Sequence, residues 1–249
     1  MPGMNDRFVS NGLSLACHVA RPAGTIEQGP AVILCHGFPI ASLDAERAGG
    51  TFPQLIDRTA NQLGCVAMTF NFRGCGESEG DFSLQGWVDD LRNAIAFLLT
   101  EHGAKSVILV GTNTGGSIAI CVLSPRADFD DWAEHPRRFL DHARDIGAIH
   151  HRDFPPSVEE WTREFRRFRP VASARRFAPR PLLVMHGEED DSVPVSDARQ
   201  LVNAHASAEL SLFEGAGHRL RHDPRAVAVL LGWLDRMRST QVHPSAERV

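Results

Sequence analysis

Several short segments of this sequence combine glycine with histidine, carboxylate or amide side chains, which are the groups used in acid–base catalysis and in binding polar ligands. Each segment follows an apolar run, and the set comprises His36-Gly37-Phe38-Pro39, residues 71–78, Gly111-Thr112-Asn113-Thr114-Gly115-Gly116, residues 186–194 and Gly215-Ala216-Gly217-His218. Ligands of open α/β sheets bind beyond the carboxyl ends of the strands. If the apolar runs are parallel strands, these segments therefore predict one polar site at one edge of a sheet.

The elements that must position this site can be read from the apolar pattern. Four apolar runs have the length and composition of strands buried on both faces of a parallel sheet, at residues 31–35, 65–70, 106–110 and 181–185. Helical patterns alternate with them, at residues 52–63, 84–102, 196–206 and 223–238, with a further strand at 209–213. Residues 7–20 alternate around Asn11-Gly12 and predict an antiparallel hairpin. This order predicts an α/β fold with a mostly parallel sheet flanked by helices.

One stretch interrupts the alternation of strand and helix. Residues 124–178 are rich in arginine, histidine, aspartate and aromatic residues, and their apolar positions have helical spacing. We interpret the stretch as a small helical cap inserted over the edge of the sheet. The expected organisation is a single domain over residues 1–249 with a helical cap insertion at about 124–178.

These segments, in this order, resemble the α/β-hydrolase superfamily, and within it the small serine esterases and acyl-aminopeptidase-like hydrolases. The resemblance covers nearly the whole chain and is carried by five short motifs at strand ends. It implies the α/β-hydrolase fold, with Asp190 of His186-Gly187-Glu188-Glu189-Asp190 as the catalytic acid and His218 as the general base. It also implies an oxyanion hole formed by the backbone amides of Phe38 and Thr114.

The sequence departs from this family at the nucleophile position. The family pattern G-x-S-x-G is here Gly111-Thr112-Asn113-Thr114-Gly115, with Asn113 in place of the serine. A carboxamide has no hydroxyl for a histidine to deprotonate, so it cannot start an acyl-enzyme pathway. The chain is therefore expected to be inactive or impaired as a serine hydrolase. Serine and asparagine codons can differ by one base, so a natural loss and a deliberate change both fit the sequence.

Two other sources of a nucleophile are less favoured. Thr112, Thr114 and Ser117 carry hydroxyls, but a nucleophile elbow aims only its central residue at the histidine. Deamidation of Asn113 would supply the aspartate that haloalkane dehalogenases and epoxide hydrolases use. Those families also hold the leaving group with a tryptophan after the nucleophile or with lid tyrosines, whereas this chain has Thr114 there and no tyrosine.

A second departure follows the elbow. The family places a helix and then a strand between the elbow and the cap, which together with their turns need roughly 20 residues. Here only residues 116–123 separate the elbow from Ser124-Pro125. This segment predicts a short helix or a strand but hardly both. We expect the sheet either to lack a strand there or to close the gap in an unusual way.

Composition narrows the classes of partner and location. The 249 residues, 43% of them hydrophobic, suit one large globular domain, and the net charge of −5 disfavours nucleic acid and anionic membranes as partners. No stretch approaches the roughly 20 apolar residues of a membrane span, and the N-terminus lacks an apolar signal. The five cysteines are widely spaced, as in proteins of reducing compartments. A cytoplasmic location is therefore expected.

No cofactor or metal is expected. The cysteines form no C-x-x-C pair, and His135, His142 and His150-His151 do not have the spacing of a closed metal site. The arginines at residues 163–180 could receive an anionic substrate, but a solvated helix face paired with neighbouring acids is the favoured interpretation.

Two hypotheses for function follow. The first is a relative of carboxylic-ester or acyl hydrolases that takes a small-molecule ester or acyl substrate and is inactivated by Asn113. The second is a non-catalytic pseudo-hydrolase that holds a small apolar ligand or a protein partner beneath the cap. Restoring a serine at Asn113 distinguishes them. No oligomeric state is predicted.

Overall fold

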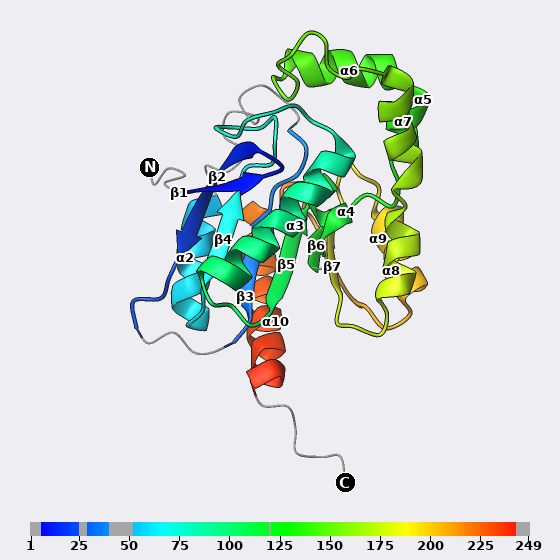
Figure 1. Cartoon of the computed structure of the whole chain (residues 1–249). Coiled ribbons are helices and arrows are strands. Elements are labelled where there is room, and N and C mark those ends of the chain that lie inside the picture. The colour runs from blue at the N-terminus through cyan, green and yellow to red at the C-terminus, as the bar shows by residue number, and fades with distance from the viewer. Residues whose placement is uncertain (1–5, 25–28, 40–51, 120, 243–249) are drawn as a thin grey trace.

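A twisted eight-stranded sheet runs through the middle of the molecule (Figure 1). The computed structural model describes residues 6–24, 29–39, 52–119 and 121–242. The strands are β1 (Asp6–Ser10), β2 (Leu13–Ala20), β3 (Ala31–Cys35), β4 (Ala67–Phe70), β5 (Val107–Thr112), β6 (Cys121–Leu123), β7 (Leu183–Gly187) and β8 (Glu209–Phe213). Their spatial order is β1-β2-β4-β3-β5-β6-β7-β8. The β2 strand is antiparallel to β1 and β4, and the other neighbouring pairs are parallel.

Helices cover both faces of the sheet, which explains why the parallel strands are apolar throughout. Alternate residues of β3 enter different clusters: Val32 and Leu34 pack with α2 (Phe52–Leu63) and α10 (Pro224–Val242). Ile33 and Cys35 pack on the other face with α3 (Leu84–Glu101). On that second face α9 (Val195–His205) covers β7. The predicted α/β fold with a mostly parallel sheet flanked by helices is confirmed.

The short segment after β5 forms both a helix and a strand, so the prediction of one or the other is wrong. Helix α4 (Asn113–Ile118) has six residues, and β6 has three. On its β5 side, β6 pairs with Val110, Gly111 and Thr112 at the end of that strand. The connection from β5 to β6 therefore spans only a short distance, and a helix of about 9 Å is long enough for that crossover.

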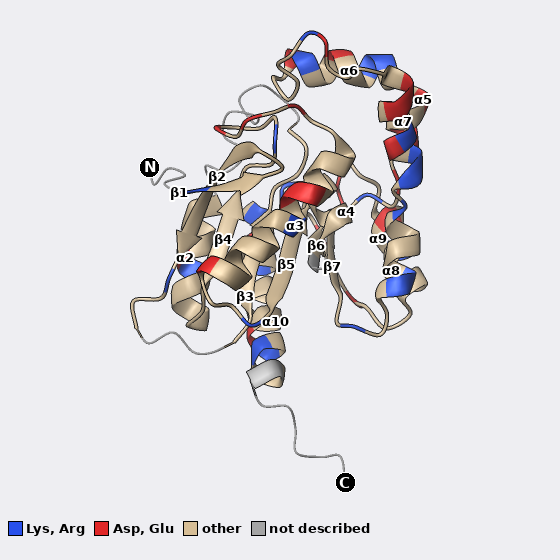
Figure 2. Ribbon diagram, viewed as in Figure 1, with Lys and Arg blue, Asp and Glu red and all other residues tan. Residues whose placement is uncertain are grey.

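Between β6 and β7 the chain forms four helices: α5 (Asp130–Glu134), α6 (Pro136–Asp145), α7 (Val158–Arg167) and α8 (Pro170–Phe177). The α5, α6 and α7 helices extend beyond the end of the sheet at which α4 begins (Figure 1). Acidic and basic residues are frequent along them (Figure 2). Arg163 pairs with Glu159 on α7, and Arg169, just before α8, pairs with Asp130 on α5, each at 2.6 Å. Such exposed pairs are typical of a solvated helix face.

Aromatic rings join these helices to the rest of the molecule. Phe38 has its ring centroid 5.3 Å from that of Trp132 and 5.1 Å from that of Phe139, and Phe82 lies 6.4 Å from Trp161. All five of these residues are buried, so the helices between β6 and β7 contact the rest of the molecule through apolar side chains. Among the described residues, no helix has the length and apolar character that crossing a lipid bilayer requires.

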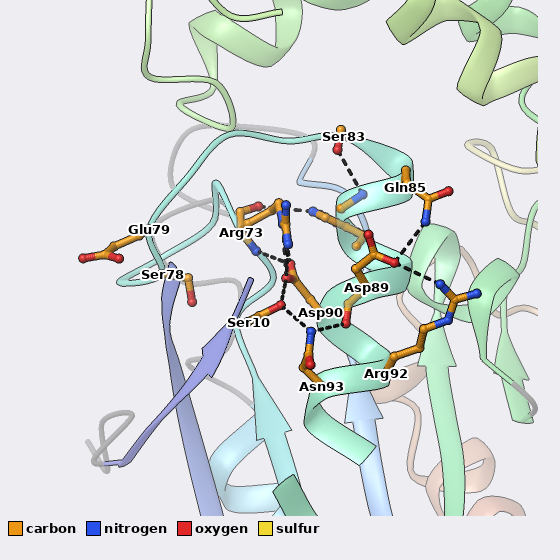
Figure 3. A network of polar contacts seen from close by, with 12 residues as sticks. Ser10, Arg73, Ser78, Glu79, Ser83, Gln85, Asp89, Asp90, Arg92 and Asn93 are labelled. Carbon is orange, nitrogen blue, oxygen red and sulfur yellow. Dashed lines mark hydrogen bonds and ion pairs between the residues drawn. The ribbon is translucent and has the colours of Figure 1, made fainter. Parts of the chain in front are cut away.

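A buried carboxylate, Asp90 on α3, ties three elements together (Figure 3). It has no exposed surface, and it accepts hydrogen bonds from the Ser10 hydroxyl at 2.6 Å and from the Arg73 guanidinium at 2.7 Å. The backbone N–H of Arg73 also donates to it at 3.0 Å. Asn93 completes the group by donating to the Ser10 hydroxyl at 3.0 Å. The network fixes the loop that follows β4 between the N-terminal hairpin and α3.

A second buried polar group, His36, lies directly after β3. The residue is 2% exposed, and its ring packs edge-on against Phe72 and Trp87, at centroid distances of 5.1 and 5.3 Å. Burial lowers the pKa of His36 to about 4, although a hydrogen bond with Gly37 acts in the opposite direction. The imidazole is therefore neutral in the folded protein at neutral pH.

We expect Asp90→Ala to lower the free energy of unfolding by about 3–5 kcal/mol, because the Arg73 guanidinium, whose side chain is only 14% exposed, loses its buried partner. Asp89→Ala on the same helix is the matched control. Its ion pair with Arg92 is at the surface, with the two side chains 27% and 69% exposed, so about 0–1 kcal/mol is expected. Urea unfolding followed by circular dichroism gives both values. Equal losses in the two variants would contradict the structural role of Asp90.

His36 should make stability depend on pH. Its pKa rises from about 4 in the folded protein to 6.5 in the unfolded chain, so the unfolded state binds more protons between these values. Stability then falls as the pH is lowered across this window, by up to about 3 kcal/mol from this residue. His36→Asn removes the titration, so its difference in unfolding free energy from the parent should change by that amount between pH 7 and pH 4. A difference that stays constant with pH would refute this assignment.

Candidate active site

A sharp turn between β5 and α4 places Asn113 at the end of the sheet. Asn113 has a φ of +49°, in the left-handed region, where asparagine is among the better-tolerated residues other than glycine. The turn is tight because two glycines allow close contacts: a Cβ on Gly111 would strike the carbonyl of Gly115, and one on Gly115 would strike the carbonyl of His36. This geometry holds the side chain of residue 113 clear of the helix that follows.

The structure brings Asn113, His218 and Asp190 together in one line of contacts. Asn113 Nδ2 lies 2.8 Å from His218 Nε2, and His218 Nδ1 lies 2.9 Å from Asp190 Oδ2. A carboxylate only accepts and a carboxamide nitrogen only donates, so the hydrogen of the neutral imidazole is on Nδ1 and Nε2 accepts from Asn113. The carboxamide oxygen of Asn113 accepts from the Thr114 hydroxyl at 3.0 Å, which fixes the orientation of the amide.

Four donors surround the Asp190 carboxylate, which has no exposed surface. The amides of Ser192 and Val193 donate to Oδ1 at 2.9 and 2.8 Å, and His186 Nε2 lies 3.3 Å from Oδ2. Burial alone would raise the pKa of Asp190, but hydrogen bonds from His186, His218 and the two amides hold it well below its usual range. Asp190 is therefore charged at neutral pH.

The two predicted oxyanion-hole residues lie beside Asn113. A Cβ on Gly37 would come within 2.7 Å of Asn113 Cβ, so the backbone of residues 37 and 38 passes directly against the elbow. Thr114 is buried in the first turn of α4, where backbone N–H groups have no acceptor within the helix. Both amides thus belong to backbone that adjoins residue 113.

The other hydroxyls near the elbow are engaged away from His218. Thr112 donates to the carbonyl of Cys35 at 3.5 Å, and Thr114 donates to Asn113. Ser117 donates to the carbonyl of Arg126 at 3.0 Å. The arrangement leaves residue 113 as the side chain that faces the imidazole.

Two supporting residues were missed by the sequence analysis. Ser124, with a φ of +49°, donates its hydroxyl to the carbonyl of His218 at 3.2 Å, so the end of the short β6 strand anchors the histidine loop. His186 binds Asp190 and also donates to the carbonyl of Val193 at 2.9 Å. The sequence signal for His186 was its place in the quoted motif, whereas Ser124 gave no signal because its contact depends on the tertiary fold.

Two hollows adjoin the site. A cavity of about 790 Å³ opens beside His218 and is lined by Arg219, His222 and Asp223 among others. An apolar pocket of about 280 Å³ lies beside α4, and its lining includes Ile118, Phe168 and Phe177. Within the described ranges, no cluster of three or more His, Cys, Asp or Glu side chains could hold a metal ion.

This chain was compared with known protein families, sequences and structures. The uncharacterized protein YfhR of Salmonella typhimurium is 28% identical over 140 residues, which are 53% of this chain and 47% of YfhR. The chain thus spans about half the length of that relative. The α/β hydrolase GrgF from Penicillium sp. sh18 has a similar structure, with a TM-score of 0.69 at 17% identity over 96% of this chain and 100% of GrgF.

Est1E from Butyrivibrio proteoclasticus is likewise similar in fold, with a TM-score of 0.66 at 17% identity over 97% of this chain and 99% of Est1E. The model of the alpha/beta hydrolase family matches residues 32–230, a range that contains Asn113, Asp190 and His218. From this match and from the shared topology we conclude that the chain belongs to the alpha/beta hydrolase family.

Proposed function

We propose that the chain is built as a hydrolase of small carboxylic esters or acyl compounds and that Asn113 suppresses its acyl-enzyme chemistry. The observation that carries the proposal is the line from Asn113 through His218 to Asp190, with separations of 2.8 and 2.9 Å. The imidazole has the tautomer that a general base needs, with the lone pair of Nε2 directed at residue 113.

With a serine at position 113, each group would have a defined task. His218 Nε2 would take the hydroxyl proton as the oxygen attacks the carbonyl carbon, and the amides of Phe38 and Thr114 would stabilise the oxyanion. His218 would then protonate the leaving alcohol, and a water activated by the same nitrogen would release the acid. Asp190 would stabilise the imidazolium and keep its orientation.

Asn113 opposes this chemistry in two ways. Its nitrogen lone pair is delocalised into the amide, so it is not a nucleophile. Its N–H also occupies the lone pair of His218 Nε2 at 2.8 Å, so a water or substrate must displace the carboxamide before it meets the base. The parent chain is therefore expected to have little ester-cleaving activity.

The helices between β6 and β7 form the cap of the site in this proposal. Phe38, whose amide is assigned to the oxyanion hole, packs its ring against Trp132 and Phe139 of the cap. An aromatic wall next to the reacting carbon suits a small apolar or aromatic acyl group. Est1E, which shares the fold, has been seen with ferulic acid bound, and this supports a small acid of that kind as the acyl part.

A second candidate is a pseudo-hydrolase that binds a small apolar ligand or a protein partner. The observation in its favour is the apolar pocket of about 280 Å³ beside α4, together with a carboxamide whose two ends are both hydrogen-bonded. In this case Asn113 would have a structural role, and the residues around it would not support catalysis after the single change Asn113→Ser.

We expect Asn113→Ser to raise kcat/KM for p-nitrophenyl acetate by roughly 10³-fold or more over the parent, and to make the chain react with a fluorophosphonate probe. A serine oxygen stops about 1.3 Å, one amide bond, short of the carboxamide nitrogen, so His218 has to approach residue 113 by less than that length to make the same contact. Asn113→Ala is the matched control, because it removes the carboxamide without adding a hydroxyl. If the serine variant is no faster than the alanine variant, the hydrolase proposal is wrong and the second candidate is favoured.

In the Asn113→Ser background, Asp190→Asn should lower kcat about 10³–10⁴-fold with little change in KM, because a carboxamide no longer fixes the imidazole tautomer. Asp191→Asn is the control, since that side chain is exposed and bonds only to the neighbouring Ser192 hydroxyl among the described contacts. Steady-state kinetics with p-nitrophenyl acetate measure both. Comparable kcat values for the two double variants would exclude Asp190 from the proposed role.

A further inference from the structure

The peptide group between Gly37 and Phe38 is held at its carbonyl end by a buried side chain. A peptide group is planar, with its C=O and N–H pointing in opposite directions. His36 Nδ1 lies 2.8 Å from the carbonyl oxygen of Gly37. Anchoring this oxygen therefore also sets the direction of the Phe38 N–H, the amide that the proposed function places in the oxyanion hole.

The imidazole of His36 is itself fixed from its other nitrogen. Nε2 accepts the backbone N–H of Phe72 at 3.1 Å, and because an N–H can only donate, the ring hydrogen of the neutral imidazole must be on Nδ1. That hydrogen is the one donated to the Gly37 carbonyl. The stacked rings of Phe72 and Trp87, 4.3 Å apart, pack edge-on against the imidazole and prevent it from turning.

The support continues into the core. Trp87 donates its indole N–H to the carbonyl of Arg73 at 3.2 Å, and the backbone N–H of Arg73 donates to Asp90. Figure 3 shows Arg73 folded against Asp90 on α3. The series of contacts that begins at His36 thus ends at the ion pair of Arg73 and Asp90.

Gly37 explains why such an anchor is needed. The elbow forces glycine at this position, since a Cβ would come within 2.7 Å of Asn113 Cβ. Glycine also gives the backbone more freedom than any other residue, so the following peptide group could rotate and direct its carbonyl at the site. A donor fixed on the carbonyl oxygen removes that freedom without adding bulk.

We propose that His36 is a positioning residue that locks the Gly37–Phe38 peptide group with its N–H directed into the oxyanion hole. The inference rests on the proposed function for its catalytic consequence, but the orientation of the peptide is a property of the chain as it stands. His36 acts through the backbone and does not touch the substrate.

Two variants separate the two ends of the imidazole in the Asn113→Ser background. In His36→Asn a carboxamide N–H can occupy the place of Nδ1 and donate to Gly37, while the acceptor for Phe72 is lost. In His36→Gln the longer side chain can accept from Phe72 but has no donor at the position of Nδ1. We expect the glutamine variant to lose about 10²–10³-fold in kcat with KM within about twofold, and the asparagine variant to stay within about tenfold of its parent.

The outcomes are distinct. Equal kcat values for the two variants, with ester cleavage by Asn113→Ser intact, overturn the role of His36 and leave the proposed function standing. If Asn113→Ser is itself inactive, the proposed function fails, and the role of His36 is decided by crystal structures of the parent chain and of its His36→Gln variant. A rotated Gly37 carbonyl in the variant supports the inference, and an unchanged peptide orientation overturns it. Urea unfolding confirms that each variant is folded before it is assayed.

Discussion

The candidate site depends on one interaction, the pairing of the buried Asp190 carboxylate with the His218 imidazole. A carboxylate with no exposed surface is costly unless several donors surround it, and here two imidazoles and two backbone amides do so. Because these donors come from the ends of β7 and β8, the pairing holds the two loops together. The second ring nitrogen of His218, Nε2, then faces residue 113.

Asn113 fits this arrangement well. Its left-handed backbone is one that asparagine tolerates, and its carboxamide gives a donor to His218 and an acceptor to Thr114. The glycines that a nucleophile elbow needs are all in place around it. The tight turn, its glycines and the His218–Asp190 pair therefore surround a carboxamide that hydrogen-bonds to the imidazole.

The sequence predicted the parts of this protein that depend on local pattern. Apolar runs located the parallel strands, and the polar segments that follow them supplied Asn113, Asp190 and His218, which the structure brings together. The β6 strand was missed because three residues are too few for a periodic pattern, and only pairing with both neighbours makes them a strand. Contacts such as those of Ser124 and Asp90 join distant segments, so no spacing along the chain could indicate them.

The short β6 strand has a mechanical consequence. Asn113 follows β5, whereas Asp190 and His218 follow β7 and β8. The β6 strand therefore lies between the strands that carry the two halves of the candidate site. It forms three residue pairs with β5 and three with β7. Sliding of one half past the other by a fraction of an ångström would change the Asn113–His218 separation directly, with few backbone hydrogen bonds to resist it. Of the strands that the structure describes, the shortest one thus lies between the two halves of the candidate site.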